Sequence, residues 1–257
     1  MKSKDAADII IFDLDKTLSE SKVPLDPDMS ALLCALLRVK KVAVISGAAF
    51  KQFEAQFLRH LTCPPEILKN LFLLPTNGAS LYEYKDGWTR LYHFAFTDKE
   101  KKKIFDAFEK AFEKTNFQKP EKTYGTLIED RDTQITFSGL GSDAPLSLKE
   151  PWDPDHAKRK ALAAALAEEL PDFSISIGGA TSIDVTRKGV DKAYGIAELM
   201  SRFGYEPKRV FYVGDALFPG GNDASVISLG VKYQSVEKGG VGETKHIIRE
   251  ILSKKIS

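Results

Sequence analysis

The stretch Ile9-Ile-Ile-Phe-Asp-Leu-Asp-Lys-Thr17 decides the fold of this chain. Four apolar residues, Ile9 to Phe12, run directly into two acids, Asp13 and Asp15. A short apolar run of this kind is typical of a strand buried on both faces of a parallel sheet. Open α/β sheets place their chemistry at the carboxyl ends of such strands. We therefore predict that Asp13 and Asp15 lie at the mouth of a site.

The spacing of these two acids also predicts a metal ion. Carboxylates held this close repel each other unless a cation is bound or one of them is protonated. A hard divalent ion with oxygen ligands removes the repulsion, and Mg2+ is the ion we expect. The alternative is that Asp13 and Asp15 form an ordinary polar turn at a strand end, because short motifs produce false positives. Residues further along the chain decide between these interpretations.

The composition narrows the class of protein. The 257 residues are 43% hydrophobic and 28% charged, which suits one large globular domain or two modest ones. A formal net charge of +1 indicates neither a nucleic-acid partner nor an acidic membrane surface. No segment approaches a membrane-spanning length, and no apolar signal core is present, so we expect a cytoplasmic protein. Cys34 and Cys63 lack metal-ligand spacing; we expect Cys34 to be a core thiol and no disulfide framework.

The outer parts of the chain alternate between strand and helix signals. Asp26-Pro27 predicts a helix start, with an N-cap followed by a first-turn proline. Apolar runs at 42–45, 71–74 and 209–213 predict further buried strands, and a helix is expected over 192–203. This alternation is typical of a parallel sheet with crossover helices. The fold class we predict is therefore α/β, with a Rossmann-like core.

The middle of the chain has a different character. Residues 80–84 and 88–93 flank Asp86-Gly87, which is a hairpin pattern, and a second hairpin is expected around 130–132. Thr97 and Glu100 form a capping box before a charged amphipathic helix. We therefore predict an α+β cap domain over 82–186, inserted into a discontinuous core made of 1–81 and 187–257. Such an arrangement commonly places small ligands between two bodies.

Four features fall at strand ends of the predicted core. They are Asp13-Leu-Asp15-Lys-Thr17, Ser46, Lys192, and Gly214-Asp215 with Gly221-Asn222-Asp223. Each has an ordinary alternative: Ser46 as a helix N-cap, Lys192 as a solvated helix residue, and Gly220-Gly221 as a flexible loop. Together they form one coherent set of groups for phosphoryl transfer, which needs a nucleophile in line with the phosphorus and neutralised phosphate charge.

The reaction assigns a role to each acid of this set. Asp13 can attack phosphorus and form an aspartyl-phosphate. Asp15 can protonate the leaving oxygen and then deprotonate water or an alcohol acceptor. We expect Mg2+ to be held by Asp13, the main-chain carbonyl of Asp15 and Asp215. Asp223 is expected to orient a metal-bound water or the Lys192 ammonium.

The remaining groups bind the phosphate. The Ser46 hydroxyl and the backbone N–H groups of the turn at Gly47 are expected to donate to phosphate oxygens. Lys192 supplies a positive charge to the phosphate and to Asp13. We set aside the four histidines, because they show no paired spacing for zinc or for a catalytic triad.

This set of residues resembles the haloacid dehalogenase superfamily of phosphatases and phosphotransferases, in the branch with an α/β cap. The chain is most similar to the eukaryotic-type phosphomannomutases, over essentially its whole length. The last third is the most specific part, and Asn77-Gly78 is similar as well. The segments that match are Ser176-Ile-Gly-Gly179, Ser182-Ile-Asp184-Val, Gly189-Val-Asp191-Lys192 and Gly214-Asp215 with Pro219-Gly-Gly-Asn-Asp223.

The resemblance implies that Ser182 and Asp184 contact the sugar phosphate, and that Arg131 matches a cap arginine of the family. It also implies that the caps can pair in a homodimer, which the cap helix permits but does not require. The site set is then as follows: catalytic Asp13, Asp15, Thr17, Ser46 and Lys192; substrate-binding Ser46, Gly47, Asn77, Arg131, Ser182, Asp184 and Lys192; metal-binding Asp13, Asp15, Asp215 and Asp223.

Three positions depart from the family pattern. Ser142, Lys149 and Tyr124 stand where the mutases carry arginines. Arginine fixes a phosphate through a bidentate fork, whereas serine gives one donor and lysine a point charge. Because a mutase must hold a distal phosphate, we expect first an Mg2+-dependent phosphatase or phosphotransferase that acts on a phosphorylated sugar or related metabolite. The alternatives are a phosphomannomutase that interconverts hexose 1- and 6-phosphates, and a non-catalytic binding protein that has kept the fold.

Overall fold

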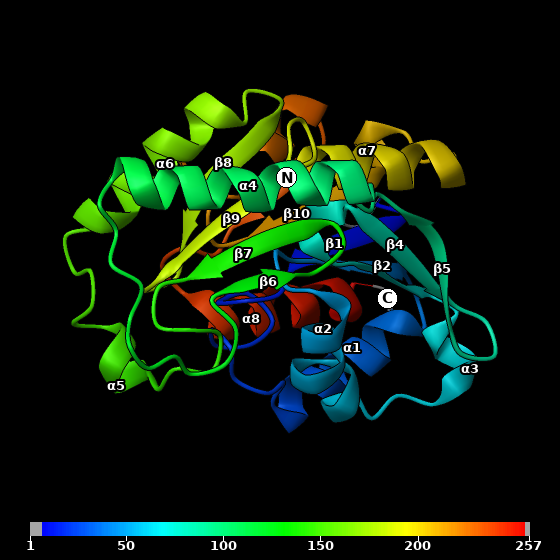
Figure 1. The fold of residues 1–257 in the computed structure, drawn as a ribbon. Helices are drawn as coiled ribbons and strands as arrows, with labels where there is room; N and C mark the ends of the chain where they lie inside the picture. The colour runs from blue at the N-terminus through cyan, green and yellow to red at the C-terminus, as the bar shows by residue number, and fades with distance from the viewer. Residues whose placement is uncertain (1–6, 255–257) are drawn as a thin grey trace. The chain divides into compact units, whose positions relative to one another are not determined.

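The computed structural model describes residues 7–254, which divide into two compact units (Figure 1). Within these residues, the first unit contains the chain up to His93 and again from Val190, and the second contains Phe94–Gly189. The borders that we expected at 81/82 and 186/187 thus lie at 93/94 and 189/190. Each unit has its own sheet and its own apolar core.

The first unit is built on a seven-stranded sheet in the order β11-β10-β1-β2-β3-β4-β5. The neighbours from β11 to β3 run parallel, which confirms the expected α/β core with a Rossmann-like parallel sheet, and β4 and β5 are antiparallel. The strands are β1 (Ile9–Asp13), β2 (Lys41–Ile45), β3 (Leu71–Leu74), β4 (Ser80–Tyr84), β5 (Trp88–His93), β10 (Val210–Gly214) and β11 (Lys232–Ser235).

Strand β1 is buried on both faces, as its apolar run predicts. Ile9 joins the apolar cluster that includes residues of α7 (Lys192–Phe203). Phe12 joins the cluster that includes α1 (Pro27–Leu37) and α8 (Gly240–Ser253). The other helices of this unit are α2 (Phe50–Gln56), α3 (Pro65–Leu68) and short 3₁₀ helices at Leu58–His60, Thr76–Gly78, Pro207–Arg209 and Ala224–Leu229. Within residues 7–254, no helix is both long and apolar enough to cross a membrane.

The expected hairpin of β4 and β5 forms, but it belongs to the first sheet. Leu73 of β3 lies opposite Tyr82 of β4 in an antiparallel ladder. Three consecutive residues with positive φ reverse the chain between these strands: Thr76 (53°), Asn77 (54°) and Gly78 (85°). Because this reversal returns the chain alongside β3, the hairpin extends the core sheet.

The second unit has a four-stranded antiparallel sheet in the order β6-β7-β9-β8. One face of this sheet packs with two long helices through an apolar cluster that includes Phe108, Phe137 and Leu162. The expected capping box of Thr97 and Glu100 is present at the first of these helices. The elements are α4 (Asp98–Lys114), β6 (Ile128–Asp130), β7 (Gln134–Ser138), α5 (Leu146–Lys149), α6 (Ala157–Glu169), β8 (Phe173–Gly178) and β9 (Ser182–Arg187).

A buried ion pair anchors α6 in the second unit. The Arg159 side chain is 1% exposed, and its Nε donates to Asp153 Oδ2 at 2.8 Å. Its Nη1 also donates to the carbonyl oxygen of Gly179 at 2.7 Å. Burial raises the pKa of Asp153, but the hydrogen bond from Arg159 and two backbone hydrogen bonds outweigh that effect, so the pKa lies below its usual value.

Replacing Asp153 with asparagine is expected to lower the free energy of unfolding by about 3 kcal/mol, because it leaves the Arg159 charge buried without its partner. The depressed pKa of Asp153 means that the pair stabilises the fold above pH 4 and that this contribution falls as the pH drops further. Denaturant unfolding of wild type, D153N and the control D155N at neutral pH measures the loss of stability. The same measurement repeated below pH 4 shows how the contribution of the pair falls. Asp155 is exposed and caps Ala157 N, a role that asparagine also fills, so D155N should change stability by less than about 0.5 kcal/mol.

The expectation of a core thiol at Cys34 is wrong, because Cys34 and Cys63 form a disulfide in the structure. Cys34 lies on α1, and Cys63 lies just before α3; these two helices pack together and bring the two Cα atoms to 5.2 Å. A separation of 29 residues carried no local signal for this pairing. Disulfides persist in oxidising compartments and are rare in cytosolic proteins. The disulfide therefore does not support the expected cytoplasmic location, which remains a prediction.

Candidate functional site

The polar residues expected at strand ends meet at one edge of the first sheet. Asp13 ends β1, Ser46 follows β2 and Asp215 follows β10. These three strands are adjacent and parallel, so their carboxyl ends lie together. The sheet order therefore explains why residues far apart in sequence form one site.

Lys192 lies at the centre of this site. It is the first residue of α7, where Asp191 caps the helix by accepting a hydrogen bond from Tyr194 N. The Lys192 side chain is buried, and its Nζ lies 2.5 Å from Asp13 Oδ1 and 2.5 Å from Asp223 Oδ1. The structure thus brings the lysine to the expected nucleophile, and it is not a solvated helix residue.

Burial and mutual repulsion dominate the electrostatics of these acids. Burial raises the pKa of Asp13 to about 7, although the Lys192 ammonium opposes this rise. Burial and the neighbouring Asp223 charge also raise the pKa of Asp215. Burial lowers the pKa of Lys192, but its two carboxylate partners outweigh that effect and raise it. The cluster therefore holds more negative than positive charge, and an added cation would favour the ionised form of Asp13.

The Asp223 carboxylate is held by three donors. Its Oδ1 accepts from Lys192 and from the buried Tyr212 hydroxyl at 2.6 Å, and its Oδ2 accepts from Ala216 N at 3.0 Å. This position of the Asp223 carboxylate requires a glycine at position 214, because a Cβ there would lie 2.3 Å from Asp223 Oδ2 and 2.7 Å from the Tyr212 ring. Asp223 is thus placed to orient Lys192, one of the two roles expected for it.

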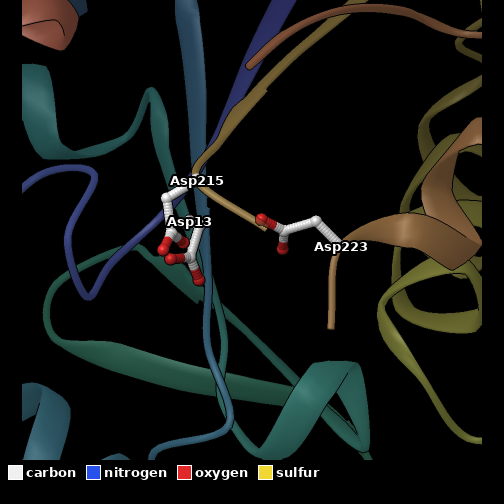
Figure 2. A group of neighbouring side chains, drawn as sticks. All are labelled: Asp13, Asp215 and Asp223. Atoms are coloured by element: carbon white, nitrogen blue, oxygen red, sulfur yellow. The ribbon is translucent and has the colours of Figure 1, made fainter. Parts of the chain in front are cut away.

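Asp13, Asp215 and Asp223 are also the acidic group that could hold a metal ion. One carboxylate oxygen from each lies within 4.8 Å of the others. In Figure 2 the carboxylates of Asp13 and Asp215 lie together, and Asp223 extends toward them from a separate loop. A set of carboxylate oxygens suits a hard divalent cation. Since both oxygens of Asp223 already accept hydrogen bonds, Asp13 and Asp215 are the better fitted ligands.

Asp15 and Thr17 lie in the loop that follows β1, shortly after Asp13 in the sequence. Asp15 Oδ1 accepts from Lys22 N at 2.8 Å and from Gln56 Nε2 at 3.1 Å. Thr17 is fully buried, and its Oγ1 has no hydrogen-bond partner within the described part of the chain. A buried hydroxyl without a partner is costly in a fold, and a ligand that supplies the missing hydrogen bond removes that cost.

Ser46 and Asn77 approach each other at the neighbouring strand ends. The Ser46 hydroxyl accepts from Ala48 N at 3.1 Å, whereas α2 begins at Phe50, so Ser46 is not the N-cap of that helix. Asn77 N donates to the carbonyl oxygen of Ser46 at 2.8 Å, and the Asn77 carboxamide lies within 4 Å of the position of a Cβ on Gly47. Asn77 Oδ1 is buried without a hydrogen-bond partner among residues 7–254. Ser46, Gly47 and Asn77 are therefore grouped as expected.

In the second unit, two of the expected substrate-binding residues lie on a polar sheet face. Asp184 Oδ1 accepts from Thr136 Oγ1 at 2.8 Å, and Thr136 Oγ1 accepts from Gln134 Nε2 at 2.9 Å. Ser182 lies opposite Ser138 in the ladder. The alternation of strand residues places these groups on the face opposite Phe137 and Ile183, which contribute to the apolar core. A row of hydroxyl, amide and carboxylate groups suits a ligand with many hydroxyls.

The positions that depart from the family pattern are engaged in local contacts. Ser142 Oγ accepts from Thr126 N at 3.3 Å and donates to Asp143 Oδ1 at 3.1 Å, while Lys149 Nζ donates to Ser142 O at 3.0 Å. The aromatic ring of Tyr124 lies beneath the Lys122 ammonium, 5.2 Å from ring centroid to Nζ. Arg131, the one expected cap arginine, donates through Nε and Nη2 to Glu129 Oε2.

Two residues that contact the site were absent from the sequence predictions. Tyr212 lies in an apolar strand and resembles a core residue, while Gln56 ends an amphipathic helix beside Phe57. Their side chains reach Asp223 and Asp15, respectively. No local pattern distinguishes such residues from ordinary core positions, so their contacts are visible only in the fold.

The chain matches known proteins along most of its length. The family model described as "Eukaryotic phosphomannomutase" matches residues 29–254. Phosphomannomutase 2 of Dictyostelium discoideum is 27% identical, with 98% of this chain and 100% of the relative covered. The phosphomannomutase of Encephalitozoon cuniculi is 28% identical, with 87% of this chain and 86% of the relative covered.

Solved structures support the fold. An IMP-bound, N-terminally truncated IMP-nucleotidase of Plasmodium falciparum superposes with a TM-score of 0.67 at 15% identity, covering 97% of this chain and 69% of that chain. A haloacid dehalogenase-like hydrolase from Bacteroides thetaiotaomicron gives a TM-score of 0.67 at 14% identity, covering 94% and 99%. At these identities the likeness concerns the fold alone.

Proposed function

Because this chain belongs to the eukaryotic phosphomannomutase family, within the haloacid dehalogenase superfamily, we propose that it interconverts hexose 1- and 6-phosphates through an aspartyl-phosphate. The observation that carries the proposal is the buried contact of Lys192 with Asp13 at the strand ends. Phosphoryl transfer needs such a nucleophile together with a positive charge for the phosphate. The family match favours isomerisation over hydrolysis, the reverse of the order expected from sequence.

In the proposed reaction an Asp13 oxygen attacks phosphorus as the bond from phosphorus to the sugar oxygen breaks. Asp15 donates a proton to the departing oxygen and is left as a carboxylate. In the second half, Asp15 takes the proton of an acceptor hydroxyl, whose oxygen then attacks phosphorus and releases Asp13. With a hexose 1-phosphate as acceptor, the product is a hexose 1,6-bisphosphate. This bisphosphate reorients in the site and transfers its other phosphoryl group to Asp13, which leaves the hexose 6-phosphate.

The groups around Asp13 bind the transferring phosphate in this proposal. Lys192 neutralises its charge, and Ser46 with the N–H groups at Gly47 donates to its oxygens. Thr17 and Asn77 also belong to the site, since each holds a buried polar atom without a partner among the described residues. These unpartnered atoms are the kind of group that a bound ligand satisfies.

Magnesium is the metal that we propose for the acidic group. Asp13, Asp215 and the Asp15 carbonyl would hold it, with Asp223 close by. When bound, it supplies positive charge that lowers the repulsion between the nucleophile and the phosphate. In the second unit we propose that Ser182, Asp184 and Arg131 contact the sugar phosphate. The polar sheet face supports this role for Ser182 and Asp184.

Hydrolysis of a sugar phosphate is the second candidate, and the replaced arginines favour it. Ser142 and Lys149 hydrogen-bond to their own loop. Neither side chain offers a phosphate the arginine fork that a distal clamp uses. If the hexose monophosphate leaves while Asp13 still carries the phosphoryl group, water takes its place as the acceptor, and free phosphate is released.

Product analysis separates the two activities. The protein is incubated with Mg2+, mannose 1-phosphate and a catalytic amount of hexose 1,6-bisphosphate, and mannose 6-phosphate and free phosphate are both measured. We expect 6-phosphate to form faster than free phosphate. Free phosphate without 6-phosphate would favour hydrolysis. Turnover of neither kind, here and with a panel of other phosphate esters, would contradict both activities.

A further inference from the structure

Gln56 lies buried beside Asp15, the residue proposed to move the proton. It is the last residue of α2, and its side chain is 4% exposed. The amide nitrogen donates to Asp15 Oδ1 at 3.1 Å and to Ser19 Oγ at 2.9 Å. Both acceptors are oxygen atoms, so the nitrogen end of the amide faces Asp15.

The oxygen of the same amide lacks a hydrogen-bond partner in the described part of the chain. This atom, Gln56 Oε1, is buried. An unsatisfied buried oxygen costs about 1–3 kcal/mol, whereas an apolar side chain of the same size would fill the position without this cost. The contact of the nitrogen with Asp15 is therefore retained at the expense of stability, which is typical of functional sites.

Among the residues that the structure describes, the hydrogen bonds to the Asp15 side chain fall on one oxygen. Lys22 N at 2.8 Å and Gln56 Nε2 at 3.1 Å both donate to Oδ1, and neither reaches Oδ2. Two donors on Oδ1 fix the plane of the carboxyl group. They leave Oδ2 as the oxygen to which no donor among the described residues points. Lys22 itself has a positive φ of 60°, so this loop maintains a strained conformation around Asp15.

We propose that Gln56 is a positioning residue, which orients Asp15 so that its Oδ2 gives the proton to the leaving oxygen and later takes one from the acceptor. This role rests on the proposed function of Asp15. Within residues 7–254, the Gln56 side chain hydrogen-bonds to Asp15 and Ser19 and not to Asp13, so its effect on the reaction passes through Asp15.

The role makes the effect of Gln56 depend on the leaving group. A sugar alkoxide is a poor leaving group, so the sugar oxygen needs the Asp15 proton as its bond to phosphorus breaks. The oxygen of p-nitrophenyl phosphate departs as a stabilised phenolate and does not need it. Since kcat/KM for each ester reports the steps up to release of that leaving group, the two esters measure proton donation separately from attack by Asp13.

The test compares Gln56→Met with wild type for mannose 1-phosphate and p-nitrophenyl phosphate. Methionine keeps the length of the side chain and removes both polar ends. We expect kcat/KM to fall about tenfold or more for the sugar phosphate and to stay within about threefold for the aryl phosphate. Gln52→Met makes the same change one turn earlier on α2, and Ser19→Ala removes the other hydrogen bond of the amide. Both controls should leave both esters within about threefold of wild type.

Each other result contradicts the role. An equal fall for both esters in Gln56→Met, or the same pattern in Ser19→Ala, would make Gln56 a structural support of the loop. No fall for either ester would leave it without a role in catalysis. Failure of the proposed function gives a different result, because the wild-type protein itself would then release neither mannose nor p-nitrophenol.

Discussion

Replacing Asp13 with asparagine is expected to lower turnover of a phosphate ester by at least about 10⁴-fold, the scale seen when a nucleophile is removed. The amide has nearly the shape of the carboxyl group, but it cannot form the acyl-phosphate bond. Because burial and the charges of Asp215 and Asp223 raise the pKa of Asp13, the ionised carboxylate is an unfavourable group at its position. The same variant should therefore unfold at a denaturant concentration no lower than that of wild type.

Asp8→Asn is the matched control for this experiment. Asp8 precedes the same strand at its opposite end, is exposed, and pairs with Arg209. Its loss should leave turnover within about twofold of wild type, since exposed ion pairs contribute little. Turnover by Asp13→Asn above about 1% of wild type, in protein free of the deamidated product, would show that another residue attacks phosphorus.

Replacing Lys192 with methionine is expected to lower kcat/KM by about 10²–10³-fold, the usual cost of removing one group that stabilises transition-state charge. The change also leaves Asp13 and Asp223 buried without their shared cation. Breaking a buried ion pair from one side costs about 3–5 kcal/mol, so the free energy of unfolding should fall by that amount. Initial rates and denaturant unfolding measure the two effects.

A double variant separates these two effects. In Lys192→Met with Asp223→Asn, one of the unpaired carboxylates is gone, so much of the stability should return while the activity stays low. Lys208→Met is the control for a lost lysine, because Lys208 is exposed and pairs with Glu206, two residues away. Recovery of activity together with stability in the double variant would reduce Lys192 to a structural residue.

The parts of the fold with strong local signals were predictable from sequence. The apolar run into Asp13 indicated a strand buried on both faces, and β1 is such a strand. Asp26-Pro27 begins a helix, and Thr97 with Glu100 forms the capping box. Each of these features depends on a few neighbouring residues, whose preferences the fold does not override.

The remaining features depend on contacts between distant segments. The hairpin at 80–93 has a clear turn signal, but its pairing with β3 is decided by the chain reversal at 76–78. The disulfide joins Cys34 to Cys63 because α1 and α3 pack together, which no spacing shows. Tyr212 and Gln56 have the residue types and periodicity of core positions. Their roles follow from where their hydrogen bonds end.

The expectations about activity show the same division. Asp13, Lys192, Asp215 and Asp223 come from different strand ends and a helix start, and the topology predicted from their flanking runs brings them together. The order of the two activities depended on Ser142, Lys149 and Tyr124, whose replacement of family arginines pointed toward hydrolysis. Similarity over 29–254 gives isomerisation the greater weight, and the contacts of Ser142 keep hydrolysis as the second candidate.

Acid quenching during turnover tests the central claim most directly. Protein mixed with Mg2+ and mannose 1-phosphate is denatured in acid within the first turnovers, digested, and mapped by mass spectrometry. We predict a phosphoryl group on the Asp13 side chain, absent from Asp13→Asn and lost on treatment with hydroxylamine. A phosphoryl group on another residue, or an unmodified Asp13 peptide at every quench time while product accumulates, would contradict the account.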